Sequence, residues 1–220
     1  RGQQLVRIDE EEEGGISGAA EAQVLAAVQH TVADADAVLV EDYNKGVLTP
    51  AVIEAILLGA KSRGIPSVVD PKFRNFFAYR GATVFKPNRR ELEAALGAAV
   101  DIEHADALPQ AMERLEVQNL LLTMGPHGMV LVGRDGALTR IPTVAREVYD
   151  VSGAGDTVTA WVGTALAAGA SVREAAELAN YAAGIEVGKS GVAVVTRDEV
   201  LDRFERHLDP AGMFRRGGVI

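Results

Sequence analysis

Cysteine is absent from the 220 residues of this chain. The sequence therefore has no disulfide framework, no thiolate metal site and no cysteine nucleophile, which suits a reducing compartment. It also lacks any run near the roughly 18 uninterrupted apolar residues of a membrane span, and it shows no N-terminal signal with a basic flank and an apolar centre. We therefore expect a soluble, cytoplasmic protein that does not take a membrane as its partner.

Basic residues are fewer than acidic ones, since 22 lysines and arginines stand against 31 aspartates and glutamates, for a formal net charge of −9. This excess of acid disfavours nucleic acid as the main partner, and a phosphorylated substrate would need a local basic pocket. His30, His104 and His207 show no metal-ligand spacing.

The hydrophobic content of 48% suffices for one good core. Short apolar, β-branched runs alternate with longer helical stretches, which is typical of βαβ units and predicts a doubly wound α/β fold. We expect strands at residues 37–40, 67–69, 83–85, 120–122, 129–132, 138–141 and 147–149. We expect helices at residues 51–63, 89–96, 106–115, 198–207 and from 171 to about 187, besides the helix that carries Asp156.

Local signals predict several ends of these elements. Thr49 is placed to cap a helix that Gly64 ends. Ser171 and Glu174 have the spacing of a capping box, and residues 134–136 read as the turn of a β-hairpin.

Polar residues fall where the predicted strands end. Asp42 and Lys45 follow the first strand, Asp70 and Lys72 the second, Asn88 and Glu91 the third, Thr123 and Gly125 the fourth, and residues 152–156 the seventh. In an open α/β sheet, ligands bind beyond the carboxyl ends of the strands, so we expect these loops to meet at one site. Lys45, Lys72 and Lys86 are candidates to contact a substrate phosphate, although lysine side chains are more often simply solvated.

The stretch Asp150-Val-Ser-Gly-Ala-Gly-Asp156 precedes a helical run of small residues. Gly153, Ala154 and Gly155 have little or no side chain, so their N–H groups can meet a phosphate oxygen at a helix N-terminus. Asp156 is then placed to take a proton from an attacking hydroxyl during phosphoryl transfer. The alternative is that the glycines only let the helix pack close to a strand, which leaves the bracketing acids Asp150 and Asp156 unexplained.

The same stretch resembles the second signature of the ribokinase (PfkB) family of carbohydrate kinases. Asn88-Arg-Arg-Glu91 fits the family's Asn-x-x-Glu element, and Thr123-Met-Gly-Pro-His-Gly128 fits its Thr-x-Gly-x-x-Gly nucleotide loop. Within the family, residues 42–49 and 3–9 look most like the branch that phosphorylates D-glycero-D-manno-heptose 7-phosphate.

The resemblance implies a ribokinase-like, doubly wound, mainly parallel sheet flanked by helices, and an ATP-dependent kinase acting on a sugar or sugar phosphate, most specifically heptose 7-phosphate at its anomeric hydroxyl. Nothing in the chain matches the family's N-terminal third, so the implied fold is N-terminally truncated. Residues 1–16 would be a lid or linker remnant, 17–209 the nucleotide-binding and catalytic core, and 210–220 a tail. Lid-mediated homodimers are common in the family. The alternatives are a nucleotide-binding fragment without catalysis, or a kinase for another sugar or nucleoside.

Residue roles follow from the resemblance. It implies that Asn88 and Glu91 organise Mg²⁺ through water, that Thr123, Gly125 and Gly128 lie along ATP, that Asn180, Ala183 and Gly184 line the adenine pocket, and that Asp150, Ser152 and carbonyls of residues 186–191 hold a monovalent cation such as K⁺. Three alternatives stay open: Asn88 and Glu91 only cap a helix, the glycines of the loop only form a tight turn, and the small residues near Asn180 only let helices cross. Asp42, Lys45 and Lys72 are the candidate substrate contacts.

Overall fold

The computed structural model describes residues 14–104, 107–145, 148–191 and 193–208. Most of the predicted lid or linker remnant, including residues 3–9, lies outside them, and so does the predicted tail. The described residues form a six-stranded sheet whose strand order follows the chain. The strands are β1 (Val38–Glu41), β2 (Ser67–Asp70), β3 (Val84–Phe85), β4 (Leu120–Thr123), β5 (Met129–Val132) and β6 (Leu138–Ile141).

The first four strands are parallel, whereas β5 and β6 continue the sheet as antiparallel neighbours. The parallel pairing brings the carboxyl ends of β1 to β4 to one edge. Glu41 and Asp70 are register partners at that edge. The predicted mainly parallel α/β sheet is therefore confirmed, with an antiparallel hairpin at one side.

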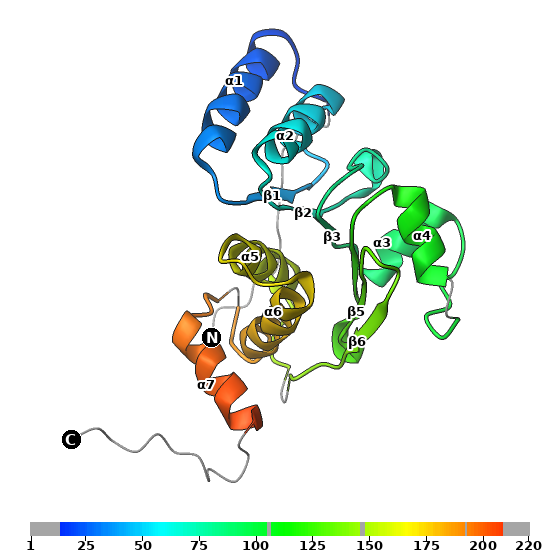
Figure 1. Cartoon of the computed structure of the whole chain (residues 1–220), viewed down its shortest axis with the longest axis vertical. Coiled ribbons are helices and arrows are strands. Elements are labelled where there is room, and N and C mark those ends of the chain that lie inside the picture. The colour runs from blue at the N-terminus through cyan, green and yellow to red at the C-terminus, as the bar shows by residue number, and fades with distance from the viewer. Residues whose placement is uncertain (1–13, 105–106, 146–147, 192, 209–220) are drawn as a thin grey trace, which may run out of the picture.

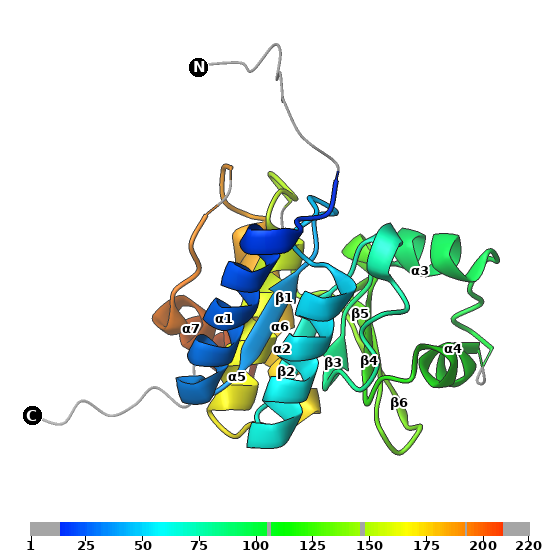
Figure 2. The same ribbon diagram turned by 90° about the horizontal axis from the view of Figure 1, so that it is seen from above.

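Helices cover both faces of the sheet (Figures 1 and 2). They are α1 (Gly18–Asp34), α2 (Pro50–Arg63), α3 (Arg89–Leu96), α4 (Ala107–Leu115), α5 (Ala154–Ala167), α6 (Val172–Glu186) and α7 (Arg197–Leu208), with 3-10 turns η1 (Phe73–Asn75) and η2 (Gly125–His127). Within these described stretches, no helix has the length and apolarity needed to cross a membrane.

Alternating strand residues feed two cores. Val69 and Phe85 pack with α2, α3 and α4, whereas Val68 and Val84 pack with α5 and α6. Both faces of the sheet are thus buried, as a doubly wound fold requires. Gly163 explains how close α5 comes, because a Cβ there would lie 2.6 Å from a methyl carbon of Leu39.

The predicted local signals are confirmed. The Thr49 hydroxyl accepts a hydrogen bond from the N–H of Val52 at 3.3 Å, and Gly64 ends α2 with φ of 66°. Ser171 and Glu174 form the predicted capping box. The N–H of Gly133 donates to the carbonyl of Ala137 at 2.9 Å, which closes the β5–β6 hairpin.

The strand predicted at 147–149 is wrong for the residues that are described there. Val148 and Tyr149 belong to no strand and are 61% and 73% exposed, while Glu147 lies outside the described residues. The N–H groups of Tyr149 and Asp150 donate to the carbonyl of Val187, at 2.6 and 3.2 Å. This segment is therefore fixed to the end of α6 instead of pairing with the sheet.

Candidate active site

A cavity of about 510 Å³ opens at the carboxyl edge of the parallel strands. It collects most of the predicted site residues: Lys72, Asn88, Glu91, Thr123, Gly125, Gly128, Ala154, Gly155, Asp156, Asn180, Ala183 and Gly184. Gly153, Asp150, Ser152, Asp42 and Lys45 are not among its lining residues. Most residues predicted to contact nucleotide or phosphate thus line the cavity, whereas of the candidate substrate contacts only Lys72 does.

The N-terminus of α5 forms one wall of this cavity. Gly153 precedes the helix with φ of 89°, a conformation that a residue with a Cβ rarely adopts. The N–H of Ala154 donates to the carbonyl of Val151 at 3.3 Å, so it turns away from the predicted role as an anion donor. The N–H groups of Gly155 and Asp156 follow in the first turn, where a helix offers no carbonyl partners and its dipole favours negative charge.

Packing does not explain Gly155. A Cβ at this position would lie 3.6 Å from the nearest atoms, Asp70 Oδ2 and Lys86 Nζ, which is ordinary contact. The alternative that the glycines serve close helix packing applies instead to Gly163, further along the helix.

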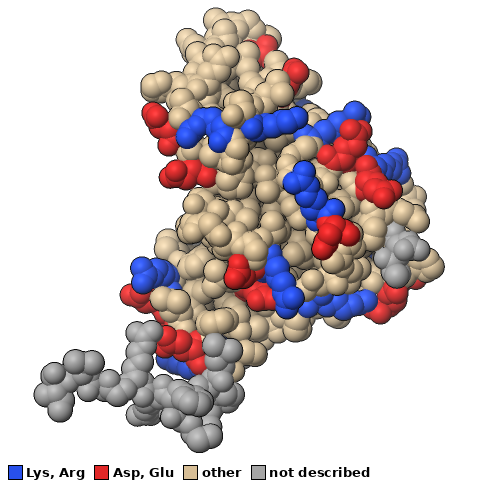
Figure 3. Space-filling view, viewed as in Figure 1, with Lys and Arg blue, Asp and Glu red and all other residues tan. Residues whose placement is uncertain are grey.

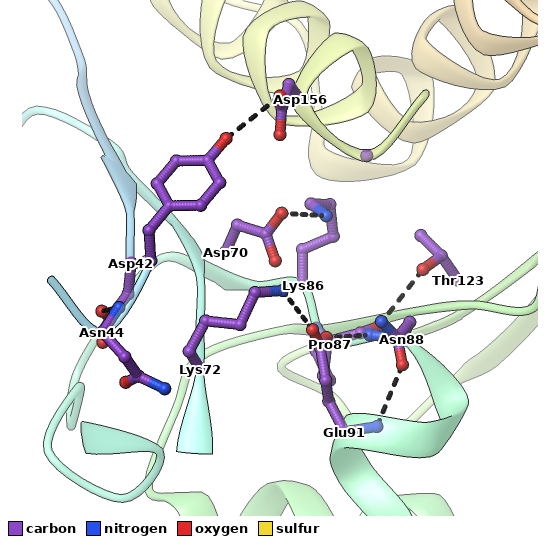
Figure 4. Close-up of polar contacts among 12 residues, drawn as sticks. Asp42, Asn44, Asp70, Lys72, Lys86, Pro87, Asn88, Glu91, Thr123 and Asp156 are labelled. Carbon is purple, nitrogen blue, oxygen red and sulfur yellow. Dashed lines mark hydrogen bonds and ion pairs between the residues drawn. The ribbon is translucent and has the colours of Figure 1, made fainter. Parts of the chain in front are cut away.

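Asp156 is exposed at the mouth of the cavity and accepts a hydrogen bond from the Tyr43 hydroxyl at 3.1 Å (Figure 4). Burial and this hydrogen bond raise the pKa of Tyr43 to about 12, so the hydroxyl remains a donor. Carboxylate oxygens of Glu41, Asp70 and Asp156 lie within 4.8 Å of one another. Burial, followed by the charge of Asp70, raises the pKa of Glu41 to about 7.

Two lysines accompany these acids. The buried Lys86 Nζ lies 2.9 Å from Asp70 Oδ2, and Lys72 pairs with Glu91 (Figure 4). Against these two ammonium groups stand Asp70, Glu91 and Asp156, and above about pH 7 also an ionised Glu41, so carboxylates outnumber ammonium groups in the site.

Asn88 and Glu91 form a reciprocal capping box at the start of α3. The Glu91 N–H donates to Asn88 Oδ1 at 2.9 Å, and the Asn88 N–H donates to Glu91 Oε2 at 2.8 Å. Because Lys72 occupies the other Glu91 oxygen, direct ligation of a metal would displace a donor. The capping alternative is realised, and the pair fits Mg²⁺ only through intervening water.

Three of the residues predicted to line the nucleotide site, Gly128, Asn180 and Gly184, contact the chain segment after β6. A Cβ on Gly128 would lie 2.2 Å from the Ile141 carbonyl oxygen, and Gly128 has φ of 78°. Asn180 Nδ2 donates to the Pro142 carbonyl at 2.8 Å, and a Cβ on Gly184 would lie 3.0 Å from Val144. The small size of these glycines is therefore required by the chain's own backbone and side chains. For Gly184 this segment takes the place of the helix crossing left open above, whereas Ala183 packs in the core that α5 and α6 share.

Asp42 is buried beneath the loop after β1. Its carboxylate accepts hydrogen bonds from the Tyr79 hydroxyl at 2.7 Å, from Asn75 Nδ2 at 3.2 Å and from the Asn44 N–H at 2.8 Å. With 3% of its surface exposed, Asp42 shapes the loop that carries Tyr43 and does not line the cavity. Lys45 is exposed on the same loop, outside the cavity.

A buried carboxylate lies behind the N-terminus of α5. Glu186 is fully buried, and neither of its oxygens accepts a well-formed hydrogen bond from a described residue, although the Ala193 N–H is close enough to lower its pKa. Burial, followed by the charges of Asp150 and Asp156, raises its pKa. Backbone and side-chain hydrogen bonds from Ser152 lower the pKa of Asp150. A buried carboxylate without a well-formed hydrogen bond, close to the charge of Asp150, fits the predicted monovalent cation.

Sequence analysis did not assign roles to Tyr43, Glu41 or the Glu186 side chain. Glu41 is the last residue of β1, one residue beyond the predicted end of that strand. An acidic residue at the carboxyl end of a strand could therefore have been recognised as a candidate for the site. Nothing local in the sequence marks Glu186 as a buried carboxylate.

Comparison with known proteins agrees with this geometry. The family described as "pfkB family carbohydrate kinase" matches residues 7–198. The Bifunctional protein HldE of Trichlorobacter lovleyi is 47% identical over 203 residues, which are 90% of this chain and 41% of that protein. The Bifunctional protein HldE of Pelobacter propionicus is 48% identical over 202 residues, with 91% and 41% covered. The chain thus spans less than half the length of these relatives.

Solved structures show the same fold. The ribokinase of Arabidopsis thaliana, complexed with ribose and ATP, has a TM-score of 0.70 at 23% identity. The match covers 83% of this chain and 59% of the ribokinase chain. The ribokinase of Thermotoga maritima has a TM-score of 0.65 at 25% identity, with 80% and 59% covered. The predicted ribokinase-like fold is confirmed, and the chain belongs to the pfkB family of carbohydrate kinases.

Proposed function

We propose that this chain transfers the γ-phosphoryl group of ATP to a hydroxyl of a sugar or sugar phosphate, with the anomeric hydroxyl of heptose 7-phosphate as the acceptor. The observation that carries the proposal is Asp156, an exposed carboxylate in the first turn of α5 at the mouth of the cavity. The choice of heptose is supported by the similarity of residues 42–49 to that branch of the family, and by the identity to the HldE proteins.

The first turn of α5 would hold the γ-phosphoryl group, since its N–H groups and dipole favour an anion. Asp156 would accept the proton of the acceptor hydroxyl as its oxygen bonds to the γ-phosphorus. The bond from that phosphorus to the bridging oxygen of ATP breaks, and ADP leaves with the electron pair. Tyr43 would orient the Asp156 carboxylate through its hydrogen bond.

The charge of the site supports Mg²⁺ as the companion of ATP. Because its carboxylates outnumber its ammonium groups, the site would repel a bare triphosphate. Mg²⁺ would supply charge neutralisation at the phosphates, and Asn88 and Glu91 would reach its water ligands. Asp150, Ser152 and Glu186 would hold a monovalent cation such as K⁺.

One observation favours the second candidate, nucleotide binding without turnover. Two of the three candidate substrate contacts, Asp42 and Lys45, lie outside the cavity. The proposal further includes a cytoplasmic location and a homodimer. Light scattering after size-exclusion chromatography tests the homodimer.

The test is ADP release from ATP with Mg²⁺ in the presence of heptose 7-phosphate, fructose phosphates, ribose or nucleosides. Asp156→Asn should lower turnover by about 10²–10⁴-fold with little change in ATP affinity. Asp198→Asn is the matched control, because Asp198 is also an acid in the first turn of a helix, α7, and does not line the cavity. ATP binding without turnover by the unaltered chain would favour the second candidate.

A further inference from the structure

Among the lysines that the structure describes, only Lys86 is buried, with 2% of its surface exposed. It follows β3 directly and lines the cavity. An ammonium group is expensive to bury, so such a lysine needs a reason to be there.

Asp70 supplies part of that reason. Its Oδ2 lies 2.9 Å from Lys86 Nζ, and the two side chains are 11% and 3% exposed. An ammonium group carries three N–H donors, and Asp70 is its one hydrogen-bond partner in the described part of the chain. The ion pair alone thus leaves N–H groups of Lys86 able to donate hydrogen bonds to a ligand in the cavity.

The position of the ammonium group is more informative than its burial. A Cβ on Gly155 would lie 3.6 Å from Lys86 Nζ, so the ammonium group lies directly against the first turn of α5 (Figure 4). That turn also carries Asp156. Lys86 is therefore the one buried positive charge, among the described residues, at the place where the phosphoryl group would sit between acceptor and ATP.

We propose that Lys86 is a catalytic residue whose ammonium group contacts the γ-phosphoryl oxygens, an inference that rests on the proposed function. Lys86 takes no part in the proton transfer. The phosphorus–oxygen bond to ADP breaks, the bond to the acceptor oxygen forms, and the proton goes to Asp156. Lys86 stabilises the negative charge on the phosphoryl oxygens between these two bonds, and Asp70 holds it in place.

A purely structural lysine would serve only to neutralise Asp70, and a double variant separates the two roles. Lys86→Met alone leaves Asp70 buried without its partner and should lower Tm. Asp70→Asn combined with Lys86→Met removes both charges and should recover Tm. If Lys86 contacts the phosphoryl group, the double variant should still turn over about 10²–10³-fold more slowly than Asp70→Asn alone.

Binding provides a second readout that does not need turnover. With Mg²⁺ present, the double variant should bind ATP about tenfold more weakly than Asp70→Asn, with unchanged affinity for AMP, which lacks the β- and γ-phosphates. Lys61→Met, on the exposed last turn of α2, is the control that should leave both affinities unchanged.

The outcomes keep the two proposals apart. A double variant that matches Asp70→Asn in both turnover and ATP affinity overturns the role of Lys86 and leaves the kinase proposal standing. If the unaltered chain turns over no acceptor, the kinase proposal fails. The comparison of ATP with AMP then still decides whether Lys86 contacts the β- and γ-phosphates.

Discussion

Glu41 shows how the fold changes the chemistry of a single residue. Burial and the charge of Asp70 raise its pKa to about 7, so the folded chain keeps a proton there that the unfolded chain loses near the ordinary value of 4.5. Because the folded state binds more protons between these values, Glu41 makes stability fall as pH rises from about 4.5 to about 7. Glu41→Gln removes this penalty and should raise the free energy of unfolding above pH 7 by about 1 kcal/mol, after allowance for partial exposure.

The measurement is urea unfolding of both proteins at pH 5 and pH 8 in EDTA. The two stabilities should be similar at pH 5 and separate at pH 8. Glu54→Gln, on the exposed face of α2, is the control for the loss of one surface charge. Equal differences at both pH values would show that Glu41 does not hold this proton.

Glu186 provides a second residue-scale prediction. A buried carboxylate without a well-formed hydrogen bond is costly, and a bound cation would offset that cost. Replacing K⁺ by tetramethylammonium at constant ionic strength should lower Tm by a few degrees, and Glu186→Gln should reduce this difference at least by half. Differential scanning fluorimetry measures both. If the Tm difference between the two salts were the same for Glu186→Gln as for the unaltered chain, the assignment of the cation to Glu186 would be contradicted.

At the scale of elements, a substitution at Gly128 tests whether this glycine is required by its contact with the segment after β6 as well as by its positive φ. Gly128→Ala places a Cβ 2.2 Å from the Ile141 carbonyl oxygen at positive φ, and should lower the free energy of unfolding by about 2–4 kcal/mol. Gly136→Ala is the matched control, because Gly136 also has positive φ, of 77°, but its Cβ would meet nothing within 4 Å. It should cost only about 1 kcal/mol. Chemical unfolding of the two variants checks the difference, and equal losses would show that the contact with Ile141 does not matter.

The elements also show what the sequence could and could not predict. The helix caps at Thr49 and Ser171 and the hairpin turn were predictable, because each depends on residues only a few positions apart. The segment at 148–149 was predicted wrongly, because its hydrogen bonds go to Val187 at the end of α6. The signature ending at Asp156 identified the site, but the burial of Asp42 depends on Tyr79, which is 37 residues away.

For the whole molecule, charge makes nucleotide binding depend on the metal. Basic and acidic side chains are interspersed on the face seen in Figure 3, and the net charge of the chain is −9, so no general positive field attracts ATP. Under the proposed function, attraction would come from the first turn of α5, from Lys72 and Lys86, and from Mg²⁺. ATP with Mg²⁺ at about 100 times its Kd should raise the free energy of unfolding by about 2.7 kcal/mol, or Tm by roughly 5–10 °C.

The same concentration of ATP in EDTA should give less than a third of that shift, because the uncompensated carboxylates then oppose the triphosphate. AMP should respond little to the removal of Mg²⁺, since it lacks the β- and γ-phosphates whose charge the metal would neutralise. Thermal unfolding with each nucleotide, with and without Mg²⁺, measures the four shifts. An ATP shift that survives EDTA would mean that Lys72, Lys86 and the helix N-terminus suffice to neutralise the phosphates, and that Asn88 and Glu91 serve only to cap α3.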